Sequence, residues 1–291
     1  MRLLPLPFIL LLGGLVSLSG IGRPAVLAQT TDANPVMTAA RTALGGEAKI
    51  AAVKTFIANG RTRQVRGDNL VPIEFEIQAE LPDKFARRDE FPAQDAGPST
   101  SGFNGDALVL IPRPTPPPPR PGAAPPTPEQ QDAALRGRLN TAKQDFARLM
   151  LGMFATSFSS FPLTFAYVAQ AEAPQGKADV IEVKGPGNFA GRLFINSQTH
   201  LPILLTWQAP QGPPGGRGPM AAAGGPPPSA GAPPPPAVVE QRMFFADYRA
   251  VDGLQLPFRI RRAAGADTTE ETTFDRFRIN AKVDPRRFET R

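Results

Sequence analysis

Few side chains in this sequence of 291 residues could do polar chemistry. It has no cysteine and one histidine, His200, which excludes disulfides, thiolate metal sites, a cysteine nucleophile and any site built from two imidazoles. His200 stands in Thr-His-Leu-Pro, and the sequence has no Gly-x-Ser-x-Gly motif. We therefore expect His200 to be a turn residue, with a catalytic base as the alternative. The sequence predicts no enzyme and no cofactor.

Acidic side chains could bind a hard cation at one place. Glu74, Glu76 and Glu80 alternate with apolar residues, so they share one face of a predicted strand. Such a row is more often a solvated sheet face, and we predict no metal site here. Gly185-Pro186-Gly187 lacks the lysine and spacing of a phosphate-binding loop and is typical of a hairpin turn.

The charge of the chain does not favour nucleic acid as a partner. The formal net charge is +6, and Arg2 and Arg23 of the N-terminal segment, which has no acidic residue, account for two of these charges. The remaining +4 is spread among acidic residues, as in Arg87-Arg88-Asp89-Glu90. We interpret this mixture as an ordinary solvated surface.

Residues 1–28 have the pattern of a signal peptide. A basic residue, Arg2, precedes the apolar stretch Leu3 to Val16, and Val26-Leu27-Ala28 fits a cleavage site after Ala28. The alternative is an uncleaved anchor, but the apolar run is shorter than the roughly 20 residues that a membrane span needs. We expect a periplasmic monomer with no transmembrane span after cleavage.

Proline is concentrated in two stretches, 112–128 and 210–236. These cannot supply strands or a core, and we interpret them as loop insertions, with docking arms for an envelope protein as the alternative. Removing them from residues 29–291 leaves about 210 residues, enough for one domain with a single core.

The remaining sequence predicts an α+β fold with one long helix. Thr127, Pro128 and Gln130 form a capping-box signature, followed by about 25 residues with one apolar face. Short helices are predicted near 36–44 and 47–53. About ten strands, mostly in consecutive antiparallel order, make up the rest, and broken alternation at Phe274 to Ile279 predicts a bulge. These strands are predicted near 73–81, 84–91, 107–111, 163–173, 178–185, 190–196, 201–208, 239–249, 255–263 and 269–279.

The order of several short motifs resembles the outer-membrane lipoprotein carrier (LolA/LolB-like) superfamily. The resemblance covers most of the chain outside the signal peptide and the two proline-rich stretches. It implies a curved antiparallel half-barrel sheet wrapped around a long lid helix and short N-terminal helices. It also implies an apolar cavity that holds acyl chains. Among the segments that carry it are Ala43-Leu44-Gly45-Gly46-Glu47, Pro82-Asp83-Lys84-Phe85, Gly102-Phe103-Asn104-Gly105-Asp106, Leu193-Phe194-Ile195-Asn196, Thr199-His200-Leu201-Pro202, Val251-Asp252-Gly253 and Val283-Asp284-Pro285.

The aromatic composition agrees with an apolar cavity. Nineteen phenylalanines stand against one tryptophan and two tyrosines, and phenylalanine needs no polar partner when buried. The function predicted is a carrier that shields an acyl chain or a lipidated protein, in outer-membrane lipoprotein sorting or transport. The alternatives are an ordinary core, and an envelope sensor or interaction module with the same fold. The predicted cavity residues are Phe75, Ile77, Phe85, Leu139, Phe146, Leu149, Met150, Met153, Phe194, Trp207, Phe258 and Ile260.

Overall fold

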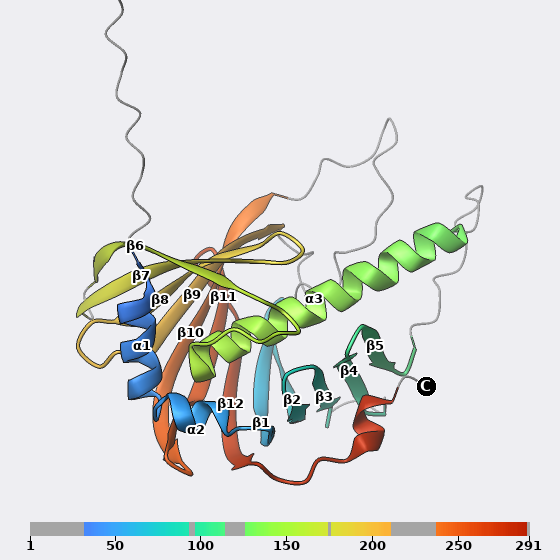
Figure 1. The fold of residues 1–291 in the computed structure, drawn as a ribbon. Coiled ribbons are helices and arrows are strands. Elements are labelled where there is room, and N and C mark those ends of the chain that lie inside the picture. Colours follow the sequence, from blue (N-terminus) through green and yellow to red (C-terminus); the bar gives the residue numbers. More distant parts are fainter. Residues whose placement is uncertain (1–31, 93–96, 114–125, 174–175, 211–236, 290–291) are drawn as a thin grey trace, which may run out of the picture.

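A computed structural model describes residues 32–92, 97–113, 126–173, 176–210 and 237–289 (Figure 1). The predicted signal peptide and most of both proline-rich stretches lie outside these ranges. The division into a signal peptide and one domain with two insertions therefore stays a prediction.

Twelve strands form one sheet in the order β5-β4-β3-β2-β1-β12-β11-β10-β9-β8-β7-β6. All neighbours are antiparallel. The strands are β1 (Thr55–Arg66), β2 (Asn69–Glu80), β3 (Lys84–Glu90), β4 (Ser99–Asn104), β5 (Ala107–Ile111), β6 (Thr164–Ala173), β7 (Gly176–Gly185), β8 (Phe189–Asn196), β9 (Pro202–Pro210), β10 (Val238–Val251), β11 (Leu254–Ala264) and β12 (Asp267–Ile279).

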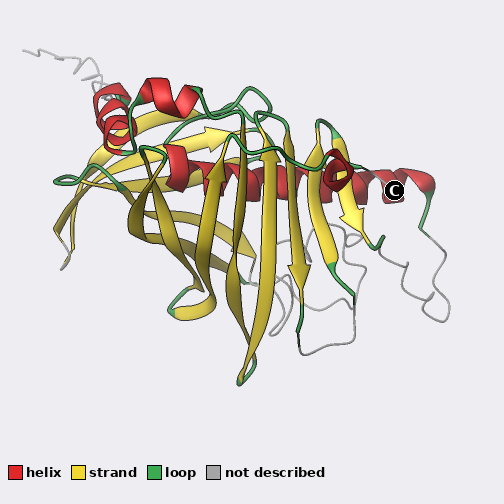
Figure 2. Ribbon diagram, turned by 90° about the horizontal axis from the view of Figure 1, so that it is seen from below, coloured by secondary structure: helices red, strands yellow, loops and turns green. Residues whose placement is uncertain are grey.

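The sheet consists of two meanders, β1 to β5 and β6 to β12, which join where β1 pairs with β12. The helix α3 (Pro128–Phe154) connects the edge strands β5 and β6 and lies across the concave side of the curved sheet (Figures 1 and 2). The predicted α+β half-barrel around a long helix is confirmed. The count of about ten strands was low by two, because β1 (TFIANGRTRQVR) and β4 (STSGFN) show no clear alternation of apolar and polar residues.

The helices begin close to where their capping signals predict. In α3, Gln130 N donates to Thr127 Oγ1 over 3.3 Å, and Thr127 N donates to Gln130 Oε1 over 2.9 Å, which completes the capping box. The short helices are α1 (Asn34–Ala43), α2 (Glu47–Ala51) and the C-terminal 3-10 helix η2 (Pro285–Phe288).

The predicted bulge lies in β12. Asn59 of β1 is opposite Arg276 and Gly60 is opposite Phe274, so Asp275 is the extra residue. The bulge turns both Phe274 and Phe277 into the core, where their ring centroids are 4.7 Å apart. The alternation of apolar and polar residues breaks here because the extra residue moves the side chains that follow it to the opposite face of the sheet.

The two halves of α3 differ in burial. Residues 128–133 are exposed, whereas all nine residues from Phe146 to Phe154 are buried. A helix buried on every side belongs to the core. Within the described ranges, no helix combines the length and the apolar character that crossing a membrane requires.

Candidate functional site: the concave face and helix α3

The apolar site predicted from the sequence is assembled on the concave side of the sheet. Eleven of the twelve predicted residues belong to the main core cluster or pack against it, and Phe194 is the exception. On β8, Leu193 and Ile195 are in the core, and because side chains alternate along a strand, Phe194 lies on the opposite face. The prediction placed Phe194 on the wrong face of the strand, because Leu193, Phe194 and Ile195 are all apolar and show no alternation.

Helix α3 fills the space where a cavity was predicted. Phe146, Met150 and Met153 are 1%, 0% and 1% exposed. A side chain next to an empty space of water size would show accessible surface, so these side chains contact protein on all sides. In this state the C-terminal half of α3 occupies the interior of the half-barrel.

A cluster of four phenylalanines joins the middle of α3 to the first meander. The ring centroid of Phe146 is 5.2 Å from that of Phe85, 5.4 Å from that of Phe103 and 6.0 Å from that of Phe158. Phe85 is only partly buried, and so is Leu139, which lies about two helical turns before Phe146 in α3. The interior is therefore less tightly enclosed at this end of α3 than at its C-terminus.

The C-terminal end of α3 is fixed by a glycine and a tyrosine. A Cβ on Gly152 would lie 2.1 Å from Cε1 of Phe245, so only glycine allows this approach. The hydroxyl of Tyr248 lies 2.8 Å from Gly152 O and 2.8 Å from Pro202 O, and it donates its single proton to these carbonyls. Burial raises the pKa of Tyr248 well above the ordinary value.

Charged side chains connect α3 to the sheet inside this apolar surface. Arg148 donates to Asp145 Oδ1 over 2.9 Å and to Gln144 Oε1 over 3.1 Å. Its guanidinium also lies 4.4 Å from the ring centroid of Trp207. Burial lowers the pKa of Arg148, and the charge of Arg262 acts in the same direction against the opposing effect of Asp145. Arg262 of β11 approaches Asp145 at 3.8 Å, which extends the ion pair to the sheet.

The polar network continues along the concave face. Thr272 Oγ1 donates to Glu270 Oε1 over 3.1 Å and lies 2.9 Å from Thr62 Oγ1. Because each hydroxyl has one proton, Thr62 must donate to Thr272 and can accept the 3.1 Å hydrogen bond from Arg87. Burial lowers the pKa of Arg87, but Asp89, Glu270 and Asp145 outweigh this effect and raise it overall.

Sequence reasoning did not find this network, whose members come from five elements. We define it as the inner polar network. It carries three positive and three negative side chains, so its charge is balanced. Its members are Thr62, Arg87, Asp89, Asp145, Arg148, Arg262, Glu270 and Thr272.

Two hairpin turns hold the middle of α3 from opposite sides. Lys143 Nζ is 2.7 Å from Asp106 Oδ1 in the turn between β4 and β5. Gln144 Nε2 donates to Gly187 O over 2.8 Å in the turn between β7 and β8. Residues on the N-terminal side of these contacts are largely exposed. The two turns therefore mark the boundary between the buried and the exposed part of α3.

The polar candidates from the sequence have structural roles. His200 is exposed in the turn between β8 and β9 with φ 57°, and its N–H donates to Asn196 O over 2.8 Å, which confirms the turn assignment. Glu76 and Glu80 pair with Arg287 and Lys84 on the outer face of β2. Among the described residues, no group of three acidic, histidine or cysteine side chains could hold a metal ion.

Comparisons with known proteins support the fold and no more. No protein-family model matches the sequence, and no curated protein sequence matches it. The structure is similar to a LolA superfamily protein from Nitrosomonas europaea, with a TM-score of 0.52 and 11% identity over 88% of this chain and 97% of that one. For a domain from Vibrio parahaemolyticus described as an outer membrane lipoprotein-sorting protein domain, the TM-score is 0.48 and the identity 8%, over 88% of this chain and 97% of that one. For a DUF1329 family protein from Desulfovibrio piger, the TM-score is 0.46 and the identity 7%, over 89% of this chain and 98% of that one. The chain has a LolA-like fold.

Proposed function

We propose that the protein is a periplasmic carrier that shields an acyl chain, either of a lipid or of a lipidated protein, on the concave face of its sheet. The observation that supports this function most is the LolA-like fold with an apolar concave face around one long helix. The signal-peptide pattern of residues 1–28 supports the location. Eleven of the twelve predicted ligand residues form the surface that the chain would contact.

The energetics restrict how such a ligand could enter. Burying a chain of 14–16 carbons contributes on the order of 10 kcal/mol, at about 0.8 kcal/mol for each CH₂. The buried half of α3 contributes a comparable amount, since each large apolar side chain is worth roughly 1.5–3 kcal/mol. Phe146, Leu149, Met150, Leu151, Met153 and Phe154 are such side chains. An acyl chain could therefore not displace all of them at no net cost.

A partial movement of α3 satisfies this restriction. Releasing Lys143 from Asp106 and Gln144 from Gly187 would free the helix up to the phenylalanine cluster. The C-terminal end would stay fixed at Gly152 and Tyr248. The acyl chain would then enter beneath Leu139 and Phe146, where the core is less enclosed, and the inner polar network would limit how far the helix opens.

A disulfide between α3 and the β7–β8 turn tests this movement. Asn140 Cγ lies 2.5 Å from the position of a Cβ on Gly187, so cysteines at both positions fall within the roughly 4 Å that a disulfide needs between Cβ atoms. The chain has no other cysteine to interfere. The variant Asn140→Cys/Gly187→Cys would be mixed, oxidised and reduced, with a fluorescent fatty-acid probe of about 16 carbons.

We expect the reduced variant and the wild type to bind the probe, and the oxidised variant to lose binding at least tenfold. The single variant Gly187→Cys is the control for strain at a position with φ 61°. Equal binding by the oxidised and reduced forms would contradict the helix movement. No probe binding by any form, together with no lipid in mass spectra of the purified protein, would overturn the carrier function.

The filled interior favours a second candidate, an envelope sensor or interaction module without lipid transfer. Phe146 and Met150 of α3 are 1% and 0% exposed, so the buried half of the helix already covers most of the concave side. In this case the proline-rich stretches 112–128 and 210–236 would supply the docking segments. Deleting both should remove partner capture, and the absence of probe binding in the wild type would decide for this candidate over the carrier.

A further inference from the structure

A second potential site lies on the outer face of the sheet, away from α3. Arg88, Thr100 and Ile111 are directly opposite one another across β3, β4 and β5. Their neighbours Phe85 and Arg87 point to the concave side, so alternation places Arg88 and its row on the outer face. A pocket of about 260 Å³ lies over this row. It is lined by Arg88, Pro98, Thr100, Ile111, Asp284, Arg286 and Arg287.

The C-terminal segment that lines one part of this pocket is held on the sheet by several contacts. The backbone N–H of Asp284 donates to Gln78 Oε1 over 2.9 Å, and the Asp284 carboxylate caps η2 by accepting from Arg286 N over 3.1 Å. Phe288 is buried, and its carbonyl accepts from Asn104 Nδ2 over 3.3 Å. The pocket therefore does not depend on ligand binding to place η2 on the sheet.

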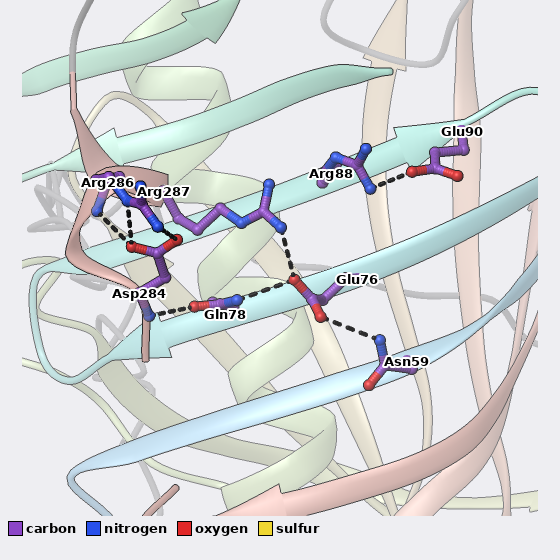
Figure 3. Close-up of polar contacts among 8 residues, drawn as sticks. All are labelled: Asn59, Glu76, Gln78, Arg88, Glu90, Asp284, Arg286 and Arg287. Atoms are coloured by element: carbon purple, nitrogen blue, oxygen red, sulfur yellow. Dashed lines mark hydrogen bonds and ion pairs between the residues drawn. The ribbon is translucent and has the colours of Figure 1, made fainter. Parts of the chain in front are cut away.

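Three guanidinium groups are oriented around the pocket by carboxylates (Figure 3). Arg88 pairs with Glu90, and Arg286 contacts both oxygens of Asp284 at 3.2 and 3.4 Å. Arg287 donates to Glu76 Oε1 over 3.4 Å. That carboxylate is itself held by Gln78 over 2.9 Å and by Asn59 over 3.4 Å.

These contacts leave donor capacity unused. A guanidinium has five N–H donors, and each of the three arginines uses one or two in its ion pair. Nε of Arg287 is buried with no hydrogen-bond partner in the described part of the chain. Because Nε has almost no accessible surface, the terminal N–H groups of Arg287 are the donors that a ligand in the pocket could reach. Thr100, also in the lining, adds a hydroxyl.

The charges nearest the pocket select an anion. Three arginines and one aspartate line it, and the carboxylates of Glu76 and Glu90, which pair with Arg287 and Arg88 and balance their charges, are not in the lining. Guanidinium donors match the oxygens of phosphate in pairs. A phosphate monoester carries about −1.5 to −2 at pH 7, and its oxygens can accept from the guanidinium donors that the ion pairs leave unused. We infer that the pocket defined by Arg88, Arg286 and Arg287 binds a phosphate group.

The phosphate could come from a small soluble molecule or from a phospholipid headgroup, and binding experiments distinguish the two. In the first arm, inorganic phosphate is titrated onto the full-length protein at low ionic strength and followed by ³¹P NMR line broadening. In the second arm, the protein is floated with vesicles of phosphatidylcholine, with or without phosphatidic acid.

The test variant is Arg286→Gln, because this side chain is 74% exposed and its removal leaves the backbone cap of Asp284 in place. Arg249→Gln is a matched control. Arg249 also contacts both oxygens of the aspartate two residues earlier, at 3.1 and 2.6 Å, and is 56% exposed, but it lies on β10 outside the pocket. Both variants lose one charge, so a general electrostatic effect would be equal in the two.

We expect saturable phosphate binding by the wild type and by Arg249→Gln, with at least a tenfold higher Kd for Arg286→Gln and for Arg88→Gln. Flotation that needs phosphatidic acid and is competed by phosphate would identify a membrane source, and no flotation would identify a soluble one. Non-saturable phosphate binding, or equal affinity of Arg286→Gln and Arg249→Gln, would overturn the inference. Fatty-acid binding concerns the other face of the sheet, so its presence or absence does not affect this result.

Discussion

The inner polar network predicts that Asp145 stabilises the protein mainly by neutralising a buried arginine. The side chain of Arg148 is 6% exposed and that of Asp145 is 21% exposed, with 2.9 Å between the paired atoms. In Asp145→Ala, Arg148 keeps its hydrogen bond to Gln144 but loses its ion pair in an apolar environment. The variant Asp145→Ala/Arg148→Met removes both charges and fills a similar volume.

The expected magnitudes follow from the cost of an unpaired buried charge. Removing one partner of a buried ion pair costs 3–5 kcal/mol, and we expect about 3 kcal/mol for Asp145→Ala because that carboxylate is partly solvated. Replacing both partners by apolar groups is often close to neutral. The double variant should therefore lie within about 1 kcal/mol of the wild type, which gives a coupling energy of about 2 kcal/mol or more once Arg148→Met is included.

Urea denaturation of the four proteins measures these energies, with Trp207 as the probe. It is the single tryptophan of the chain, and the guanidinium of Arg148 lies 4.4 Å from its ring. The exposed pair of Asp247 and Arg249 is the control, for which coupling below about 1 kcal/mol is expected. If the effects of Asp145→Ala and Arg148→Met are additive, Arg148 does not depend on Asp145 for its charge, and the reasoning fails.

Two further variants examine the C-terminal end of α3. Gly152→Leu should lower the free energy of unfolding by at least about 1–3 kcal/mol in the same urea experiment, because Phe245 must move. Gly97→Ala is the control and should have little effect, because nothing lies within 4 Å of a Cβ at that position. In the variant Tyr167→Phe, Tyr248 is the only tyrosine left. A pH titration followed by tyrosine absorbance should then show no ionisation at the ordinary pKa of about 10. Because folding raises this pKa, the stability that Tyr248 contributes is complete below the unfolded pKa and is lost as pH rises toward the folded one. Ionisation at the ordinary value would contradict the burial of the hydroxyl.

The sequence predicted the elements well where a local signal exists. The capping box at Thr127, the alternation of Ile73, Phe75 and Ile77 and the bulge at Phe274 to Ile279 depend on neighbouring residues, and the structure has all three. Phe194 was misplaced because three apolar residues in a row do not show which of them face the core. The filling of the interior by α3 depends on contacts between distant segments, which no local pattern contains.

One run of charged residues on β3 contributes to both the inner polar network and the outer arginine pocket. Arg87-Arg88-Asp89-Glu90 was interpreted as a solvated surface. The pleat of β3 instead divides it between two faces, with Arg87 and Asp89 paired inside the half-barrel and Arg88 and Glu90 paired outside. Reading the run with the parity of Phe85 would have assigned each pair to its face. The remaining members come from other strands, from α3 and from the C-terminal segment around η2, so only the tertiary structure brings them together.

The pairing of the first strand with the last has a consequence for how the chain folds. Phe56 of β1 lies opposite Ile279 of β12, so the centre of the sheet joins residues more than two hundred positions apart. Pairings of such long range slow folding, because the loop must close before the contact stabilises it. During synthesis, β1 can form hairpins with β2 but has an open edge until almost the whole chain has been made. The N-terminal meander is therefore the segment that we expect a holding chaperone to bind, and it should be protected from aggregation only when β12 arrives.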